Sequence, residues 1–305
     1  MKCGITIKKI IKFKSKIISS KSNLTNEKNY KWWNNNPMLY DWDNNIDKKK
    51  LDLHYFKQID DIFGYGHSLC NNPEWPKSKI LKNFIPYSKF KNKKVLEIGC
   101  GAGLVAQDIA KSEAILTAID ITEKAIELTK KRFSLNNLSA DIIKMDAEKL
   151  KLKDNSIDFV VSWGVIHHSG SMQKIINEIH RVLKKNGEAY IMVYNKNSLR
   201  YRFYCVFWLG IFKLYFFKYL TLNKIAGAIT DGYIARHLNR TDANIFFNKF
   251  KSLKLSYSDE INTISLYLLG PLNRFLFLIP KNFKNSFEKF LAKRFGWYMQ
   301  IVVKK

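Results

Sequence analysis

The sequence predicts an α/β protein built on a doubly wound, mostly parallel sheet of seven strands with helices on both faces. Three observations predict this fold class. Apolar segments of strand character alternate with amphipathic helical segments from Lys93 to Tyr194, as in successive strand–helix–strand units. A glycine-rich turn follows the first strand, and an acid or a histidine lies near the end of each of four strands. Because parallel strands end at one edge of a sheet, these polar residues are expected to meet there.

The first strand runs into a turn with glycines at every second position. Residues 95–103 read VLEIGCGAG, so Glu97 lies two residues before the first of three alternating glycines. A dinucleotide loop of the form G-x-G-x-x-G would need a glycine where Leu104 stands. The phosphate-binding pattern G-x-x-x-x-G-K-[ST] is absent from this turn, and the Glu97 carboxylate would repel a phosphate. The turn therefore favours a nucleoside with a cationic tail as its ligand.

The second strand ends in an acid at the position typical of a ribose ligand. Residues 116–119 are mostly apolar and precede Asp120, about 20 residues beyond the glycines, where doubly wound folds place the acid that binds the ribose hydroxyls. Thr122 then predicts the N-cap of a helix whose apolar face includes Ile126 and Phe133. Asp120 is therefore the best second ligand.

Three more strands and a helix complete the parallel part of the sheet. Their order is a short strand at 140–144, a strand at 157–162, a helix at 175–183 and a strand at 189–194. The strand at 140–144 leads to Asp146. The strand at 157–162 leads to the sequence WGVIHH, which ends with His167 and His168. Together with Glu97 and Asp120, these residues are expected to line one crevice at the carboxyl ends of the strands.

The run from Leu96 to Tyr194 resembles one enzyme family. Its E-x-G-x-G-x-G pattern, the WGVIHH segment and the turn LKKNG are similar to those of class I S-adenosylmethionine-dependent methyltransferases of the type 11 group, such as the methyltransferases of ubiquinone and menaquinone biosynthesis. The resemblance implies a Rossmann-like fold and S-adenosylmethionine as the cofactor, with Glu97 at its amino group. The cofactor-binding residues that it implies are Glu97, Gly99, Cys100, Gly101, Gly103, Asp120, Ile121, Asp146, Ala147 and Ser162.

His167 and His168 are the candidates for catalysis. If the methyl acceptor is a hydroxyl, a base with a pKa near 7 helps the reaction, and a histidine at the edge of the crevice can supply it. If the acceptor is a carbon or a sulfur atom, the two histidines only orient it. Paired histidines at a strand end can also be packing residues beside the pocket, and the sequence leaves these three interpretations open.

Composition argues against several other kinds of site. The four cysteines are scattered and form no C-x-x-C pair, so neither a zinc site nor a disulfide framework is indicated, no metal is expected, and a reducing, cytoplasmic compartment is favoured. The formal net charge of +26 suggests a nucleic-acid partner, but most of the 52 basic residues are Lys, whereas phosphate recognition favours the forked Arg side chain. No recognised RNA-binding signature is present, so nucleic acid is not the expected partner.

Two segments outside the core carry apolar residues. Residues 30–90 are rich in aromatic side chains and predict a cap over the cofactor, with the glycine-flanked segment 63–67 as its mobile part. Residues 199–220 hold many aromatic residues between flanking cations, but their longest uncharged run of ten residues is shorter than the roughly 20 that a membrane span needs. This insert is an interfacial helix, a lid over a hydrophobic substrate or an ordinary buried helix.

The C-terminal part completes the fold. Residues 253–257 and 296–303 predict the sixth and seventh strands, the last one antiparallel, and the apolar segment 264–279 lies between them. The predicted division of the chain is a basic arm at 1–29, a helical and aromatic cap at 30–90, the cofactor-binding core at 91–198, a hydrophobic insert at 199–240, and the rest of the core with a helical insert at 241–305.

The sequence as a whole predicts transfer of a methyl group to a small, hydrophobic or membrane-associated acceptor. The expected enzyme is cytoplasmic and touches the membrane peripherally. Two alternatives stay open at this point: an RNA methyltransferase, and a cofactor-binding module without activity. An RNA enzyme would bind with a steep salt dependence, and an inactive module would bind the cofactor without turnover.

Overall fold

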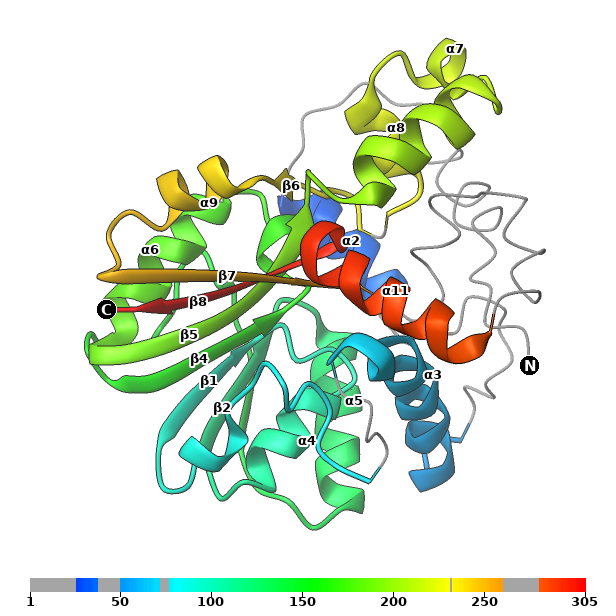
Figure 1. Ribbon diagram of the computed structural model, residues 1–305. Helices are drawn as coiled ribbons and strands as arrows, with labels where there is room; N and C mark the ends of the chain where they lie inside the picture. Colours follow the sequence, from blue (N-terminus) through cyan, green and yellow to red (C-terminus); the bar gives the residue numbers. More distant parts are fainter. Residues whose placement is uncertain (1–25, 38–49, 72–76, 231, 260–279) are drawn as a thin grey trace.

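The computed structural model describes residues 26–37, 50–71, 77–230, 232–259 and 280–305, and of residues 26, 65–71 and 281 it describes only the backbone. The predicted basic arm up to residue 25 and the predicted apolar segment 264–279 therefore lie outside the described residues. Figure 1 shows a twisted central sheet with helices on both sides of it.

The sheet has the predicted parallel core and antiparallel end. Its strands follow the order β3-β2-β1-β4-β5-β8-β7. Their bounds are β1 Lys94–Ile98, β2 Ile115–Asp120, β3 Asp141–Lys144, β4 Ile157–Trp163, β5 Leu183–Asn195, β7 Ser252–Ser258 and β8 Tyr298–Lys304. Strands β1 to β5 pair in parallel, whereas β8 is antiparallel to both β5 and β7. The predicted α/β class with a mostly parallel sheet is confirmed.

The described residues include an eighth, two-residue strand that the sequence analysis missed. Strand β6, His237–Leu238, pairs in parallel with the last two residues of β5, Tyr194 and Asn195. Because Tyr298 of β8 already pairs with Tyr194 on one edge of β5, β6 occupies the other edge, beyond the last β4 residue, Trp163. Strand β6 thus borders the edge of the sheet where the parallel strands end.

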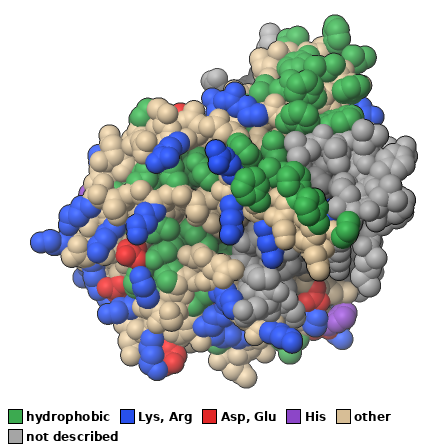
Figure 2. All heavy atoms as spheres, viewed as in Figure 1, with side chains coloured by type: hydrophobic (Ala, Val, Ile, Leu, Met, Phe, Trp, Pro, Cys, Tyr) green, Lys and Arg blue, Asp and Glu red, His purple; other side chains and the backbone are tan. Residues whose placement is uncertain are grey.

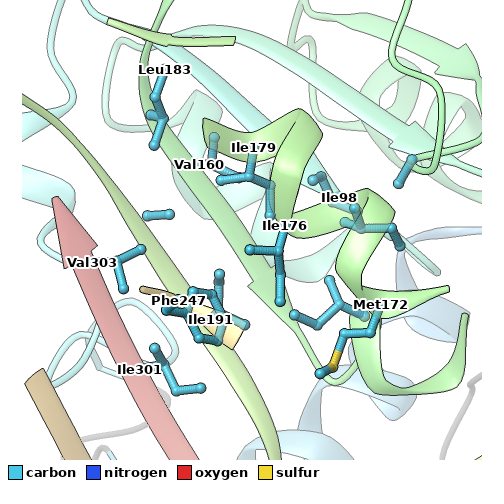
Figure 3. Packing of buried hydrophobic residues seen from close by; sticks show 14 of the residues in the cluster. Ile98, Val160, Met172, Ile176, Ile179, Leu183, Ile191, Phe247, Ile301 and Val303 are labelled. Atoms are coloured by element: carbon cyan, nitrogen blue, oxygen red, sulfur yellow. The ribbon is translucent and has the colours of Figure 1, made fainter. Parts of the chain in front are cut away.

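Helices cover the two faces of the sheet with separate hydrophobic cores. Helices α6 (Met172–Val182) and α9 (Arg240–Phe246) pack on one face, and Figure 3 shows Ile176 and Ile179 of α6 close to Val160 of β4. Helices α4 (Leu104–Ala110) and α5 (Glu123–Leu135) pack on the other face, where Val161 of β4 belongs to their core. Neighbouring residues of β4 are thus buried on opposite faces, which explains the continuous apolar run of this strand.

The cap is helical and packs on α5. Helix α2, Asn26–Asn35, and helix α3, Leu53–Asn71, both contact α5. The segment 63–67, predicted as the mobile part of the cap, lies inside α3. The predicted boundary between arm and cap falls within α2, because that helix begins at Asn26. Asp60 of α3 forms a bidentate ion pair with the buried Arg132 of α5, at 2.8 and 2.7 Å.

The hydrophobic insert follows directly from the carboxyl end of β5. It consists of a π-type helix, η3, at Arg200–Ile211 and the short helices α7, Tyr215–Tyr219, and α8, Leu222–Ala228. Part of its apolar surface is buried in a core of its own, which includes Tyr204, Leu209 and Ile225. Helix α11, Lys281–Phe295, directly precedes β8. The insert therefore lies at the same edge of the sheet as the strand ends (Figure 1).

Candidate active site

A cavity of about 230 Å³ opens at the carboxyl ends of the parallel strands. The glycine loop after β1 and the ends of β2 and β4 form its base, and side chains of α2 and α3 cover it. The structure brings most of the predicted cofactor-binding residues into its wall: Glu97, Gly99, Cys100, Gly101, Asp120, Ile121, Asp146 and Ala147. The independent sequence signals therefore meet in one place.

The glycine loop leaves open space on its cavity side. A Cβ atom on Gly99 would lie 2.3 Å from Cγ2 of Val165, whereas a Cβ on Gly101 would meet no protein atom within 4 Å. Gly101 lines the cavity with a φ of +55°, a backbone conformation that residues with a Cβ rarely adopt. Arg132 fixes the next residue, because its Nε donates to the carbonyl oxygen of Ala102 at 2.6 Å. The loop thus presents bare main chain to a ligand.

Asp120 connects the glycine loop to the first turn of α5. Its Oδ2 accepts a hydrogen bond from the amide of Gly101 at 3.2 Å. Its Oδ1 accepts from the amide of Thr122 at 3.0 Å and from the Thr122 hydroxyl at 2.9 Å. Burial raises the pKa of Asp120, and the hydrogen bonds from Thr122 and Gly101 oppose that rise. Each carboxylate oxygen can accept two hydrogen bonds, so Oδ1 is saturated by Thr122, whereas Oδ2 keeps a lone pair for one further donor.

Glu97 is a buried carboxyl group with unused hydrogen-bonding capacity. Its side chain lines the cavity, the residue is 4% exposed, and Oε2 has no hydrogen-bond partner among the described residues. Burial raises the pKa of Glu97 to about 8, and the nearby Asp120 carboxylate adds to this rise. A cation beside Glu97 would favour its ionised form and reverse the effect of burial.

The cavity carries acidic side chains in a strongly basic chain. The carboxyl groups in its wall, over the described part of the chain, are those of Glu97, Asp120, Asp146 and Glu148. Among the described residues, no Lys or Arg lines this cavity, although the chain has a formal net charge of +26. This arrangement suits a cationic ligand and would repel a phosphate.

The two histidines lie in the short helix η2, Ile166–His168, but occupy different environments. His168 lines the cavity, and its Nδ1 forms a hydrogen bond with the carbonyl oxygen of Ile234. Because a carbonyl oxygen only accepts, neutral His168 carries its proton on Nδ1 and its basic lone pair on Nε2. The ring of Trp33 packs against His168 with a centroid distance of 5.0 Å. His168 therefore has the tautomer of a base that acts through Nε2.

Three predicted site residues lie outside the cavity wall. His167 is fully buried, its ring nitrogens have no hydrogen-bond partner among the described residues, and burial holds its pKa well below the usual range. The Ser162 hydroxyl donates to the carbonyl oxygen of Ile98 at 3.3 Å. Gly103 faces Thr129, whose Oγ1 would lie 3.0 Å from an added Cβ. In this structure these residues contact protein groups around the cavity.

The structure adds wall residues that the sequence analysis did not assign to the site. Asn29 and Trp33 come from α2, Phe63 from α3 and Tyr298 from β8. Asn29 and Trp33 are four residues apart and so share one face of their helix. That spacing is the only sequence signal for this pair, and it does not reveal which element the helix covers.

The described residues contain neither a metal-binding cluster nor a helix that could span a membrane. Within these parts of the chain, no group of three or more His, Cys, Asp or Glu side chains is arranged to hold a metal ion. None of the helices described combines the length and the apolar character that crossing a bilayer requires.

Comparison with known proteins agrees with the geometry. A family model described as a methyltransferase domain matches residues 96–191. A ubiquinone biosynthesis O-methyltransferase from Pelagibacter ubique is 33% identical over 144 residues, which cover 44% of this chain and 60% of that protein. A protein of the same name from Rickettsia canadensis is 30% identical over 164 residues, which cover 51% of this chain and 67% of that protein. The matched part of the chain thus spans 60% and 67% of the length of these two relatives.

Solved structures of methyltransferases are similar at lower sequence identity. A methyltransferase from Aquifex aeolicus is 14% identical with a TM-score of 0.46, covering 84% of this chain and 99% of that one. One from Methanosarcina mazei is 19% identical with a TM-score of 0.47, covering 76% of this chain and 97% of that one.

Proposed function

Because this chain belongs to the class I S-adenosylmethionine-dependent methyltransferases, we propose that it transfers a methyl group to a hydroxyl of a small, hydrophobic, aromatic acceptor of the quinone-precursor type. The observation that carries the proposal is the acidic cavity at the carboxyl ends of the strands. Its carboxyl groups and its open glycine loop suit a nucleoside with a cationic amino acid tail. The names of the relatives support oxygen as the methylated atom.

The cofactor fits the groups that line this cavity. Glu97 would accept hydrogen bonds from its amino group, since Oε2 is buried and has no partner among the described residues. Asp120 would accept from a ribose hydroxyl through Oδ2, and Asp146 and Ala147 would flank the adenine. Gly101 would lie against the cofactor, because a Cβ at that position projects into empty space. When bound, S-adenosylmethionine supplies an electrophilic methyl group on its sulfonium.

The protein contributes alignment and one proton transfer. Displacement at a methyl group requires the acceptor oxygen, the methyl carbon and the sulfur to lie in line, so the main task of the cavity is positioning. We assign His168 as the base that takes the proton of the acceptor hydroxyl through Nε2. The carbonyl oxygen of Ile234 holds the ring in the required tautomer.

Aromatic and apolar side chains favour a hydrophobic aromatic acceptor. Trp33 beside His168 supplies one aromatic face of the cavity. Trp163 and Tyr298, whose rings pack together at a centroid distance of 5.8 Å, supply another, and Met192 lies in the same wall. A flat aromatic ring packs well between such surfaces.

We propose that the acceptor reaches the cavity from a membrane surface, because the insert exposes a patch of apolar side chains. The patch consists of Phe207, Ile211, Phe212, Leu214, Phe217 and Leu220, of which Phe217 is 83% exposed. Figure 2 shows hydrophobic side chains gathered over this end of the molecule. The sequence from Ala189 to Thr230 holds six Lys and Arg residues and no acid, which suits anionic lipid headgroups.

Transfer of a labelled methyl group tests the proposal. Protein, S-adenosylmethionine labelled in its methyl group and an octyl-substituted catechol are incubated, and label extracted into an organic solvent is counted. We expect an O-methylated catechol from the wild-type protein and a loss of at least 100-fold in kcat with His168→Gln. Cofactor binding without turnover on any acceptor in lipid, small-molecule and RNA fractions of a lysate would instead indicate a module without activity.

A further inference from the structure

A second residue of the cavity wall has a buried acceptor with no partner among the described residues, and it comes from the cap. Asn29 of α2 is 5% exposed and lines the same cavity as Glu97. Its Oδ1 has no hydrogen-bond partner among the described residues. Buried acceptors are paired in the great majority of cases, so an unpaired one beside a cavity indicates a ligand with a donor group. Two residues with such an acceptor, Glu97 and Asn29, line one cavity here.

Hydrogen bonds join helix α2 to the first turn of α5, next to the cavity. The hydroxyl of Tyr30 donates to the carboxylate of Glu123, and Asn34 Oδ1 accepts from the amide of Lys124 at 3.3 Å. Glu123 and Lys124 are the first residues of α5 and come directly after the segment 120–122, which includes the proposed ribose ligand Asp120. The anchors thus hold α2 beside the cofactor end of the cavity.

The face of α2 next to these anchors carries the residues that line the cavity. Asn29 and Trp33 are one helical turn apart, and both lie in the cavity wall. Trp33 packs against His168, the proposed base, and therefore faces the acceptor. Asn29 lies one turn toward the start of the helix. An amide suits the hydroxyls and the amino group of the cofactor better than it suits a hydrophobic acceptor.

We infer that Asn29 is a cofactor-binding residue, which the cap supplies to the site. This inference rests on the proposed function. Its Oδ1 accepts a hydrogen bond from a ribose hydroxyl or from the amino group of the cofactor. The cap then does more than cover the cavity, because one of its residues completes the polar contacts that Glu97 and Asp120 begin.

Asn29→Leu tests the inference, because it removes the polar atoms at nearly constant volume. We expect the affinity for S-adenosylhomocysteine, measured by calorimetric titration, to fall at least tenfold, while KM for the octyl-substituted catechol stays within twofold. The melting temperature of the ligand-free variant should equal or exceed that of the wild type, because a buried acceptor without a partner has been removed. If the Asn29 amide only stabilised the fold, Asn29→Leu would instead melt at a lower temperature than the wild type.

Asn35→Leu is the matched control, since Asn35 is exposed on the same helix, and it should leave both measurements unchanged. Asn29→Ala serves as a second variant if the leucine does not fit. Wild-type affinity in both Asn29 variants, or a change confined to KM for the acceptor, would overturn the inference and leave the proposed function standing. If the wild-type protein itself does not bind S-adenosylhomocysteine, the proposed function fails and the inference fails with it.

Discussion

Val165 occupies the space beside Gly99, so that a Cβ at position 99 would lie 2.3 Å from Cγ2 of Val165. The neighbouring Gly101 has no protein atom within 4 Å of the corresponding position. Two glycines of one loop therefore have different roles. Gly99 permits the contact between the loop and the segment after β4, whereas Gly101 leaves space for a ligand.

Alanine at these two positions should separate stability from binding. Gly99→Ala should lower the melting temperature of the ligand-free protein by more than Gly101→Ala, because only the first creates a clash. Both add the strain of a left-handed backbone, roughly 1–2 kcal/mol. Gly101→Ala should weaken binding of S-adenosylhomocysteine at least tenfold. Thermal unfolding and calorimetric titration of the two variants check this, and normal binding by Gly101→Ala would contradict it.

Asp120→Ala should weaken cofactor binding at least tenfold. A hydrogen bond from a ribose hydroxyl to this charged acceptor contributes about 1.5–3 kcal/mol. The variant also loses the bonds to Gly101 and Thr122, so some loss of stability is expected. Calorimetric titration with S-adenosylhomocysteine measures the affinity. Asp141→Ala, at the exposed start of β3, is the control, and unchanged affinity in Asp120→Ala would rule out this ribose site.

Binding of the cofactor near pH 7 should release a proton from Glu97. The ligand-free protein holds this carboxyl group largely protonated, because burial raises its pKa to about 8, and the amino group of the cofactor favours the ionised form. Calorimetric titration in two buffers with different heats of ionisation measures the release. Glu97→Gln cannot ionise and should show no such difference; a difference that persists in the variant would assign the proton to another group.

The raised pKa of Glu97 can also be measured without ligand, through the stability of the protein. Between the unfolded pKa near 4.5 and the folded value of about 8, the native state binds more protons than the unfolded state. The free energy of unfolding therefore falls with rising pH across this window. Melting temperatures measured from pH 5 to pH 8 should fall more steeply for the wild type than for Glu97→Gln, and parallel curves would count against the raised pKa.

The two adjacent histidines should differ in kinetic effect. His168→Gln should lower kcat by about 10² or more with cofactor affinity preserved, since a general base contributes a factor of this size. His167→Gln should keep kcat within a few fold, because His167 lies outside the cavity wall and both of its ring nitrogens are buried. Equal losses in both variants would contradict this division of roles.

Binding to liposomes should persist at high salt and depend on the exposed side chains of the insert. Burial of a side chain such as Phe212 or Phe217 contributes roughly 1.5–3 kcal/mol, and salt does not screen this contribution. Replacing Phe212, Phe217 and Leu220 by Ser should abolish sedimentation with anionic liposomes. The control is Ile115→Ser, an exposed apolar residue at the amino end of β2. If the protein does not bind liposomes at any salt concentration but binds RNA at low salt, this result would favour an RNA substrate.

Most of the sheet could be predicted because its signals are local. Val160 and Val161 are buried on opposite faces of β4, and a strand buried on both sides has a continuous apolar sequence. Strand β6 could not be predicted, since a pair such as His237 and Leu238 has no periodicity. The helix that runs through Gly64 could not be predicted either, because glycine has a low helix propensity and α3 depends on its tertiary packing.

The candidate site could be predicted as far as it lies at strand ends. Glu97 and Asp120 follow from the topology of the sheet, which brings the carboxyl ends of parallel strands together. Asn29 and Trp33 could not be found in this way, because their place depends on where α2 packs against the rest of the fold. No local pattern separates His168 from His167, since they are adjacent and only the three-dimensional arrangement turns one of them to the cavity.

The insert leaves the sheet at the carboxyl end of β5, the edge at which the cavity opens. A molecule held on a bilayer by this patch would meet its acceptor by lateral diffusion in two dimensions. The effective acceptor concentration would then be its mole fraction among the lipids. Adding plain lipid at a fixed amount of acceptor would slow the enzyme, although the bulk concentrations of protein and acceptor stay the same.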